Sequence, residues 1–322
     1  MKEKIFLTRT LHDFALKELK KKFQIEIHKG KIPIPQNTLK LKIRDVNGLI
    51  CFPYDKIDKE IIQSAKNLKV ISTFSVGYDH IDIKFAKKKK IRVGYTPEVL
   101  TNATADMAFA LLIDGLRRIS EGDRLIRKGK WNQIYGAYDY VGLDLQGKTL
   151  GIIGLGRIGK TLAKRAKAFD MKIIYYNRKQ ISKTEERKLG VKYIAFKKLI
   201  SQADIISIHV PHTIETDQMF NMKIFKKMKK TSFLINTSRG KVVNEKELAL
   251  ALKQKIISGA GLDVFEKEPI NKNHQFLKLE NVVLAPHVGS STKETRSKMA
   301  EITTKNLILG MSGKKPIYSI GY

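Results

Sequence analysis

The sequence predicts an α/β fold built from two doubly wound parallel sheets. Short apolar runs alternate with helical patterns along almost the whole chain, which is the order expected of strand–helix–strand units. The alternation pauses once, in the stretch "TPEVLTNATAD", where Pro97 and an Asn/Thr-rich run mark a crossover, and then starts again. A chain of 322 residues is long enough for two cores of ordinary size.

The first series of apolar runs predicts five buried strands, several with helices between them. Their sequences are KIFLT (4–8), QIEIH (24–28), GLICF (48–52), LKVISTF (68–74) and IRVGYT (91–96). Runs of this length and composition are typical of strands in a parallel sheet that is covered on both faces.

The second series follows a long helix, which we expect at about 102–128. Six further strands are predicted, with the sequences KTLGIIG (148–154), MKIIYY (171–176), DIISIHV (204–210), SFLINTS (232–238), SGAGLDV (258–264) and NVVLAPH (281–287). The last helical stretch, 292–310, is expected to return to the first sheet. The prediction is therefore a discontinuous domain of 1–101 and 288–322, and a second domain of 102–287.

The charge of the chain is strongly positive, with 62 Lys and Arg against 31 Asp and Glu, a formal net charge of +31. The basic clusters at 20–22, 87–90 and 226–230 are separated along the chain and their basic residues are all Lys, whereas phosphate and base recognition favours the forked Arg side chain. We therefore expect a solvated basic surface and no specific nucleic-acid partner. Attraction of anionic ligands or weak nucleic-acid binding is the alternative.

No membrane partner is expected either, because the longest apolar run, 107–113, is far shorter than the roughly 20 residues of a membrane span. Cys51 is the single cysteine, so no disulfide within the chain is possible. A reducing cytoplasm is the location that this predicts.

A glycine motif, "GLGRIG", lies between a predicted strand and a predicted helix. Gly154 allows the tight turn, Gly156 lets the backbone approach a pyrophosphate, and Gly159 permits close packing of helix on strand. The N-terminus of the helix would bind the phosphates, with Arg157 and Ile158 in the same loop. This predicts a Rossmann-type domain that binds a dinucleotide cofactor.

The strand after this motif ends at Asn177, 18 residues beyond Gly159, where NAD-binding folds usually carry an acidic residue. Asn177 removes the repulsion of a 2′-phosphate, and Arg178 and Lys179 offer two cations to it. We therefore expect NADP(H) to be preferred, with NAD(H) possible. The alternative is an ordinary basic turn in a Lys-rich protein.

Several further motifs occur together and in order: "SVGYDHID" (75–82), "NATADMAFALL" (102–112), "NTSRG" (236–240), "GLDVFEKEP" (261–269) and "APHVGSS" (285–291). With them the chain resembles the D-isomer-specific 2-hydroxyacid dehydrogenases over nearly its whole length, and most of all their glyoxylate/hydroxypyruvate reductase branch. The resemblance implies a Rossmann cofactor domain, a flavodoxin-like substrate-binding domain, an active-site cleft between them, and a homodimer formed through the Rossmann domain.

The resemblance also assigns the catalytic residues Arg239, Glu268 and His287. Reduction of a 2-oxo acid needs a cation for the carboxylate, an acid for the carbonyl oxygen and a hydride donor. Arg239 would fork onto the substrate, His287 would be the general acid, and Glu268 would orient the imidazole. Taken singly, each residue has an alternative explanation without catalysis. Arg239 could be an ordinary turn arginine, Glu268 a surface acid and His287 a core or loop histidine.

The remaining site residues also follow from the match to the family. Val76 and Gly77 match the backbone amides that hold the substrate carboxylate, together with Arg239. The other cofactor-binding residues that the resemblance implies are Thr104, Val210, Pro211, Thr216, Thr237, Asp263, His287 and Gly289. No metal site is expected, since the histidines show no ligand spacing.

The activity that follows is NADPH-preferring reduction of glyoxylate, hydroxypyruvate or both to glycolate and D-glycerate, with the proton coming from His287. One alternative is another enzyme of the family, of D-lactate, 3-phosphoglycerate or formate type. Another is a cofactor-gated binding protein, as related corepressors are. The loop 131–148 departs from the reductase branch, whose further Trp reaches the partner subunit's active site, and Tyr138 or Tyr140 would have to replace that Trp.

Overall fold

The computed structural model describes residues 2–321, which separate into two compact units. Unit 1 contains Met1–Leu100 and Ser290–Tyr322, and unit 2 contains Thr101–Gly289. The predicted boundaries, after residues 101 and 287, lie one and two residues from these divisions. Which unit binds substrate and which binds cofactor remains a prediction at this stage.

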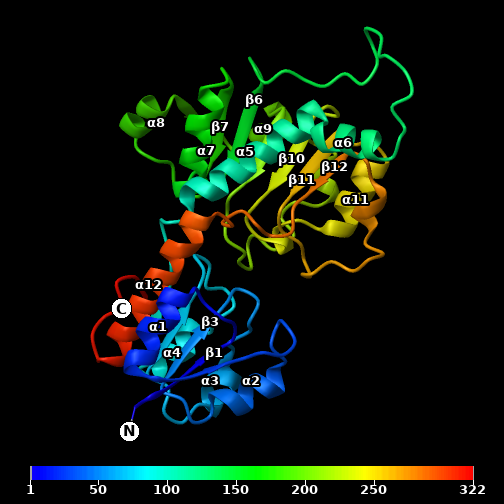
Figure 1. The fold of residues 1–322 in the computed structure, drawn as a ribbon. Helices are drawn as coiled ribbons and strands as arrows, with labels where there is room; N and C mark the ends of the chain where they lie inside the picture. Colours follow the sequence, from blue (N-terminus) through cyan, green and yellow to red (C-terminus); the bar gives the residue numbers. More distant parts are fainter. Residues whose placement is uncertain (1, 322) are drawn as a thin grey trace. The chain divides into compact units, whose positions relative to one another are not determined.

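Unit 1 is built on a mostly parallel sheet with the strand order β13-β5-β4-β3-β1-β2 (Figure 1). The strands are β1 (Lys4–Leu7), β2 (Gln24–Ile27), β3 (Gly48–Cys51), β4 (Val70–Thr73), β5 (Arg92–Gly94) and β13 (Ser319–Ile320). The helices are α1 (Asp13–Lys22), α2 (Gln36–Ile43), α3 (Lys59–Ser64), α4 (Ile83–Lys88) and α12 (Lys293–Met311). Strands β1 to β5 follow the 2-1-3-4-5 order of flavodoxin-like sheets, and β13 alone of these pairs antiparallel, with β5.

Unit 2 is built on a parallel sheet with the order β12-β11-β10-β9-β6-β7-β8. The strands are β6 (Thr149–Ile153), β7 (Lys172–Tyr176), β8 (Val191–Tyr193), β9 (Ile205–Ile208), β10 (Phe233–Asn236), β11 (Gly259–Leu262) and β12 (Val282–Leu284). The helices are α5 (Thr101–Arg117), α6 (Ile119–Arg127), α7 (Arg157–Lys167), α8 (Lys183–Leu189), α9 (Phe196–Gln202), α10 (Met222–Phe225) and α11 (Glu245–Lys253), with the 3-10 turns η1 (Gly240–Val242) and η2 (Gln275–Lys278). Counted from β6, the order is the 3-2-1-4-5-6 of a Rossmann sheet with one strand added.

The apolar runs of the sequence supply the cores of both units. Strands β3, β4, β9, β10 and β11 are buried at every position, as expected for strands covered on both faces. In unit 2, one apolar cluster contains residues of α9 and α11 and a second contains residues of α5 and α7, so helices from both clusters cover the sheet. The prediction of two parallel-sheet α/β domains is confirmed.

One predicted element is wrong in detail: the long helix at 102–128 is two helices. Arg118 has a left-handed backbone (φ 57°) and separates α5 from α6. The Asp114 carboxylate accepts the Ser120 N–H at 2.7 Å, and the Leu116 carbonyl accepts the Leu143 N–H at 2.9 Å instead of continuing the helix. These hydrogen bonds therefore end α5, although the apolar periodicity of the sequence continues beyond it.

All eleven predicted strands are present, each shortened by one to four residues, whereas β8 and β13 were not predicted. These two strands have three and two residues, too short for a periodic signal. Across residues 2–321, no helix is both long enough and apolar enough to cross a membrane.

Candidate active site

His287 and Glu268 form a hydrogen-bonded pair in unit 2. The His287 Nδ1 atom lies 2.7 Å from Glu268 Oε2, and the other carboxylate oxygen, Oε1, accepts the Phe265 N–H at 2.8 Å. The two side chains are 26% and 15% exposed. Because Nδ1 faces the carboxylate, Nε2 is the imidazole nitrogen that can exchange a proton with another group.

The turn that carries His287 has a left-handed backbone at that residue, with φ 55°. Non-glycine residues seldom adopt this conformation without support. Here Asp263, directly after β11, accepts the Val288 N–H at 2.7 Å and the Gly289 N–H at 2.8 Å. Burial raises the pKa of Asp263, while these two N–H groups act to lower it. Asp263 therefore shapes the turn of His287.

Three predicted cofactor residues come together at this turn. A Cβ built on Gly289 would lie 2.9 Å from Asp263 Oδ2 and 3.6 Å from the Thr104 methyl on α5. Thr104 and Asp263 are both buried. The small residue at 289 therefore lets the turn approach α5 closely.

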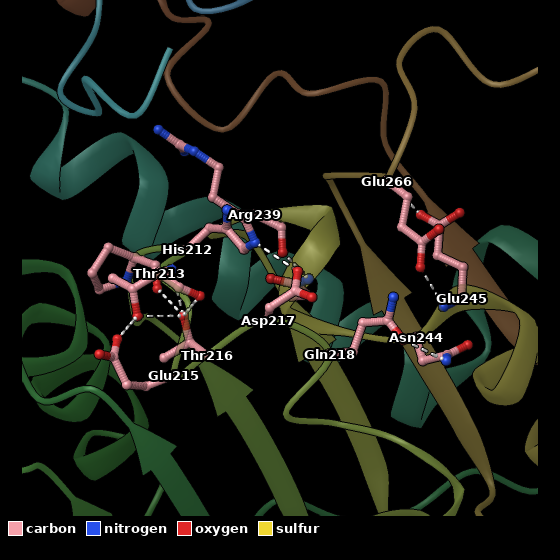
Figure 2. Close-up of polar contacts among 12 residues, drawn as sticks. His212, Thr213, Glu215, Thr216, Asp217, Gln218, Arg239, Asn244, Glu245 and Glu266 are labelled. Carbon is pink, nitrogen blue, oxygen red and sulfur yellow. Dashed lines mark hydrogen bonds and ion pairs between the residues drawn. The ribbon is translucent and has the colours of Figure 1, made fainter. Parts of the chain in front are cut away.

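Arg239 lies in a tight turn after β10. Asn236, which is buried, donates from Nδ2 to the Arg239 carbonyl at 2.9 Å. Gly240 has no room for a side chain, because a Cβ there would lie 1.9 Å from the Phe265 carbonyl carbon. The Arg239 turn thus packs directly against the loop that carries Glu268. Figure 2 shows the extended Arg239 side chain, whose Nη1 atom donates to the Ser238 carbonyl at 2.8 Å.

The three glycines of the GLGRIG motif differ in what requires them. Gly154 has φ +98°, and its Cβ would lie 2.8 Å from the His209 carbonyl. A Cβ on Gly159 would lie 2.6 Å from the Gly154 carbonyl oxygen, so both positions are required by the protein's own backbone. A Cβ on Gly156 would meet nothing within 4 Å. Protein packing therefore does not explain the glycine at 156.

Asn177 has a structural role that the sequence did not indicate. Its Oδ1 atom accepts the Leu155 N–H at 2.6 Å, which ties the end of β7 to the glycine loop. Arg178 and Lys179 are exposed, and neither forms an ion pair within residues 2–321. Arg178 and Lys179 therefore follow Asn177, whose side chain is already hydrogen-bonded to the glycine loop.

The loop after β9 contains the predicted residues Val210, Pro211 and Thr216. Val210 lies beside the glycine loop, because a Cβ on Gly154 would be 3.0 Å from its Cγ1. Thr216 Oγ1 donates to the Pro211 carbonyl at 2.7 Å and accepts the Thr213 N–H at 2.7 Å. Figure 2 shows this turn. The Thr216 hydroxyl thus stabilises the turn of this loop. Contact of Thr216 with a cofactor remains a prediction.

In unit 1, Val76 and Gly77 lie in the turn after β4, and both are half-buried. The Ser75 hydroxyl donates to the Gly77 carbonyl. Phe74, before the turn, stacks on Phe52 with ring centroids 5.0 Å apart. Within the described residues, the Val76 and Gly77 N–H groups donate to no protein acceptor. They are therefore available to an anion.

A nicotinamide dinucleotide fits several features of unit 2. The space beside Gly156 suits the close approach of a pyrophosphate, and Gly156, as the N-cap residue of α7, contributes no side-chain cap to the helix. The Thr237 hydroxyl is buried and has no hydrogen-bond partner within residues 2–321. Arg178 and Lys179 suit a phosphate at the ribose. By contrast, no group of three or more His, Cys, Asp or Glu in the described chain is arranged to hold a metal ion.

Comparison with known proteins gives consistent matches over the whole chain. Residues 109–289 match the model of the D-isomer specific 2-hydroxyacid dehydrogenase NAD binding domain. A glyoxylate reductase from Thermococcus litoralis is 48% identical over 98% of this chain and 96% of its own.

Two solved structures are also similar. The TT0316 protein from Thermus thermophilus has a TM-score of 0.92 and 39% identity, covering 98% of this chain and 99% of its own. An NADPH-dependent glyoxylate/hydroxypyruvate reductase from Sinorhizobium meliloti, in complex with NADP and malonate, has a TM-score of 0.86 and 30% identity, covering 100% and 97%.

Proposed function

Because this chain belongs to the D-isomer-specific 2-hydroxyacid dehydrogenase family and is an NAD(P)-dependent oxidoreductase, we propose that it reduces glyoxylate and hydroxypyruvate, with NADPH as the preferred cofactor. The products would be glycolate and D-glycerate. The observation that carries the proposal is the His287–Glu268 pair, next to the packed turn of Arg239. The identity to a glyoxylate reductase supports the choice of substrate.

The proton for the carbonyl oxygen would come from His287. Glu268 faces Nδ1 and so fixes the orientation of the ring, from which Nε2 would donate to the oxygen as negative charge develops on it. The bond from the Phe265 N–H holds the carboxylate in line with the imidazole. In the reverse direction the neutral imidazole would accept the hydroxyl proton.

The substrate carboxylate needs a cation and N–H donors. Arg239 would supply the guanidinium in a forked contact, and the unengaged N–H groups of Val76 and Gly77 would supply neutral donors. Arg239 would also stabilise the carbonyl oxygen, since its charge is permanent. With the carboxylate and the carbonyl oxygen assigned to Arg239 and the two N–H groups, proton transfer is the role that falls to His287.

The cofactor would be held by the residues of unit 2 that fit it. The Gly156 loop and the N-terminus of α7 would bind the pyrophosphate, and Arg178 with Lys179 would bind a 2′-phosphate. Thr237 and Asp263 lie at the ends of neighbouring strands β10 and β11, where a nicotinamide ring would be placed. When bound, the reduced nicotinamide supplies the hydride that adds to the carbonyl carbon.

We further propose a homodimer formed through unit 2. Helix α6 buries none of its residues, and it exposes Ile119 and Ile126. Tyr140 is engaged within its own chain, since its hydroxyl donates to the Arg118 carbonyl at 2.9 Å and its ring lies 4.0 Å from the Arg118 guanidinium. Tyr138 is 94% exposed and is therefore the tyrosine placed to contact a second copy. Sedimentation should give twice the chain mass, and a monomer at micromolar concentration would contradict the dimer.

A cytoplasmic location is the final part of the proposal. Cys51 is buried, and burial raises the pKa of its thiol. Such a thiol needs no oxidising compartment.

Substrate and cofactor are tested together by initial rates on a panel of glyoxylate, hydroxypyruvate, pyruvate and 3-phosphohydroxypyruvate, each with NADPH and NADH. We expect the largest kcat/KM for glyoxylate or hydroxypyruvate with NADPH. A larger kcat/KM for pyruvate or for the phosphorylated acid would move the enzyme to another branch of the family. The absence of turnover with every small 2-oxo acid would refute the reductase activity.

A further inference from the structure

The orientation of Glu268 depends on one short loop, 263–268. At one end of this loop Asp263 anchors the His287 turn, and in its middle the Phe265 N–H donates to Glu268 Oε1 at 2.8 Å. Any movement of the Phe265 backbone would therefore change the direction in which Glu268 meets the imidazole.

Two glutamates hold the backbone of loop 263–268 by a reciprocal pair of hydrogen bonds, which we name the Glu245–Glu266 clamp. The Glu266 N–H donates to Glu245 Oε1 at 2.5 Å, and the Glu245 N–H donates to Glu266 Oε1 at 3.0 Å. Figure 2 shows the two side chains reaching toward one another. Glu245 is the first residue of α11, so the clamp ties the loop to that helix. Gly240 packs against the same Phe265–Glu266 peptide from the Arg239 turn.

Glu245 itself is buried and positioned from a third side. His274 Nδ1 accepts the Phe276 N–H at 3.4 Å, so the ring proton lies on Nε2, which donates to Glu245 Oε2 at 3.2 Å. Burial and the nearby Glu266 carboxylate raise the pKa of Glu245. Two carboxylates at this place cost electrostatic energy. Their removal would leave two backbone N–H groups without acceptors, which also costs energy.

The clamp therefore acts by placing two acceptor oxygens for backbone N–H groups. The repulsion between its two carboxylates opposes folding. We propose that Glu245 is a positioning residue for the proposed proton transfer: through Glu266 it holds the Phe265 N–H against Glu268, and so aligns Glu268 with His287. The inference rests on the proposed function, in which His287 is the general acid. Nothing in it requires Glu245 to touch substrate or cofactor.

The first test compares turnover in variants that keep or lose the acceptor. Glu245→Ala is expected to lower kcat by about 10- to 100-fold, the scale of small misplacements in an active site, with the Kd for NADPH changed by less than about threefold. Glu245→Gln keeps one acceptor oxygen for the Glu266 N–H but loses the acceptor for His274 Nε2, so its kcat should lie closer to that of wild type than to that of the alanine variant. Glu245→Asp keeps the charge but shortens the reach, so it should resemble the alanine variant. It also replaces that variant if Glu245→Ala does not fold.

A matched control lies on the same turn of α11. Glu247 Oε2 accepts the Met222 N–H at 2.5 Å, a comparable bond that does not reach loop 263–268. Glu247→Ala should therefore leave kcat within about twofold of wild type. An equal loss of kcat in Glu247→Ala and Glu245→Ala would mean that α11 acts only through stability, and would overturn the proposal.

A double-mutant cycle with Glu268→Gln separates positioning from general damage. If Glu245 acts through Glu268, then Glu245→Ala should add less than about twofold to the loss already caused by Glu268→Gln. Fully additive losses would overturn the proposal.

A second readout needs no turnover. The His287 Nδ1–H bonded to Glu268 should give a downfield exchangeable proton resonance, assigned by its absence in His287→Gln. We expect Glu245→Ala to shift or broaden this resonance, and Glu245→Gln to keep it. An unchanged resonance in a folded Glu245→Ala variant would refute the clamp, even if the protein proved inactive on every 2-oxo acid.

Discussion

Replacing His287 by alanine is expected to lower kcat for glyoxylate reduction by about 10²- to 10⁴-fold, the usual contribution of a positioned general acid. The reason is that His287 is placed, by its 2.7 Å bond to Glu268, to donate from Nε2. Binding of NADPH should change by less than about threefold, because the contacts proposed for the pyrophosphate and the ribose are made by other residues of unit 2. Steady-state rates and a fluorescence titration with NADPH measure the two effects.

The matched control for this variant is His212, which forms another histidine–carboxylate pair with Asp217 at 2.8 Å. His212→Ala should leave kcat at saturating NADPH within about twofold of wild type. Turnover that survives His287→Ala unchanged would remove His287 from the mechanism. A loss of NADPH binding equal to the loss of kcat would show that His287 matters for the cofactor instead.

The double variant Asn177→Asp with Arg178→Ala is expected to lower the ratio of kcat/KM for NADPH to that for NADH by about ten- to a thousandfold. An ion pair near a protein surface contributes up to about 4 kcal/mol before screening, and about 1.4 kcal/mol is one factor of ten. An aspartate at 177 can still accept the Leu155 N–H, so the glycine loop should keep its conformation. The change then tests charge alone.

Two further variants control this result. Lys172→Ala removes an exposed cation from the opposite end of β7 and should leave the ratio unchanged. The pKa of Glu215 is lowered chiefly by the hydrogen bond from the Thr213 hydroxyl and in smaller part by Arg178, so Glu215 competes weakly for that cation and Glu215→Gln should raise the preference for NADPH slightly. If the double variant and Lys172→Ala have the same ratio, the basic end of β7 does not select the cofactor.

Much of the fold could be predicted because most strands are short apolar runs bounded by polar or turn residues, and the central strands of both sheets are buried as expected. Strand β2 was also expected to be buried, but it lies at the edge of its sheet and none of its residues is buried. The catalytic candidates could be named because Arg239, Glu268 and His287 occur in motifs that resemble those of the family. These motifs lie at strand ends or in the loops that follow them. In a parallel sheet those ends lie at one edge, so residues far apart in sequence can meet. The His287–Glu268 contact is an instance of this rule.

What could not be predicted depends on contacts that leave no periodic signal. The bond from Asn177 to Leu155 spans 22 positions, and the Glu245–Glu266 clamp spans 21. The break at Arg118 is set by side-chain and backbone bonds to its neighbours, while the apolar pattern runs through it. Asn236 lay inside a recognised motif, yet its role in shaping the Arg239 turn is visible only in the structure.

Transfer of deuterium from NADPH labelled at the hydride position tests the central claim most directly. With glyoxylate or hydroxypyruvate as acceptor, we predict that deuterium appears at C2 of the product, and that the glycerate formed from hydroxypyruvate has the D configuration. Mass spectrometry and chiral chromatography measure both. Unlabelled product, or glycerate of the L configuration, would contradict the account.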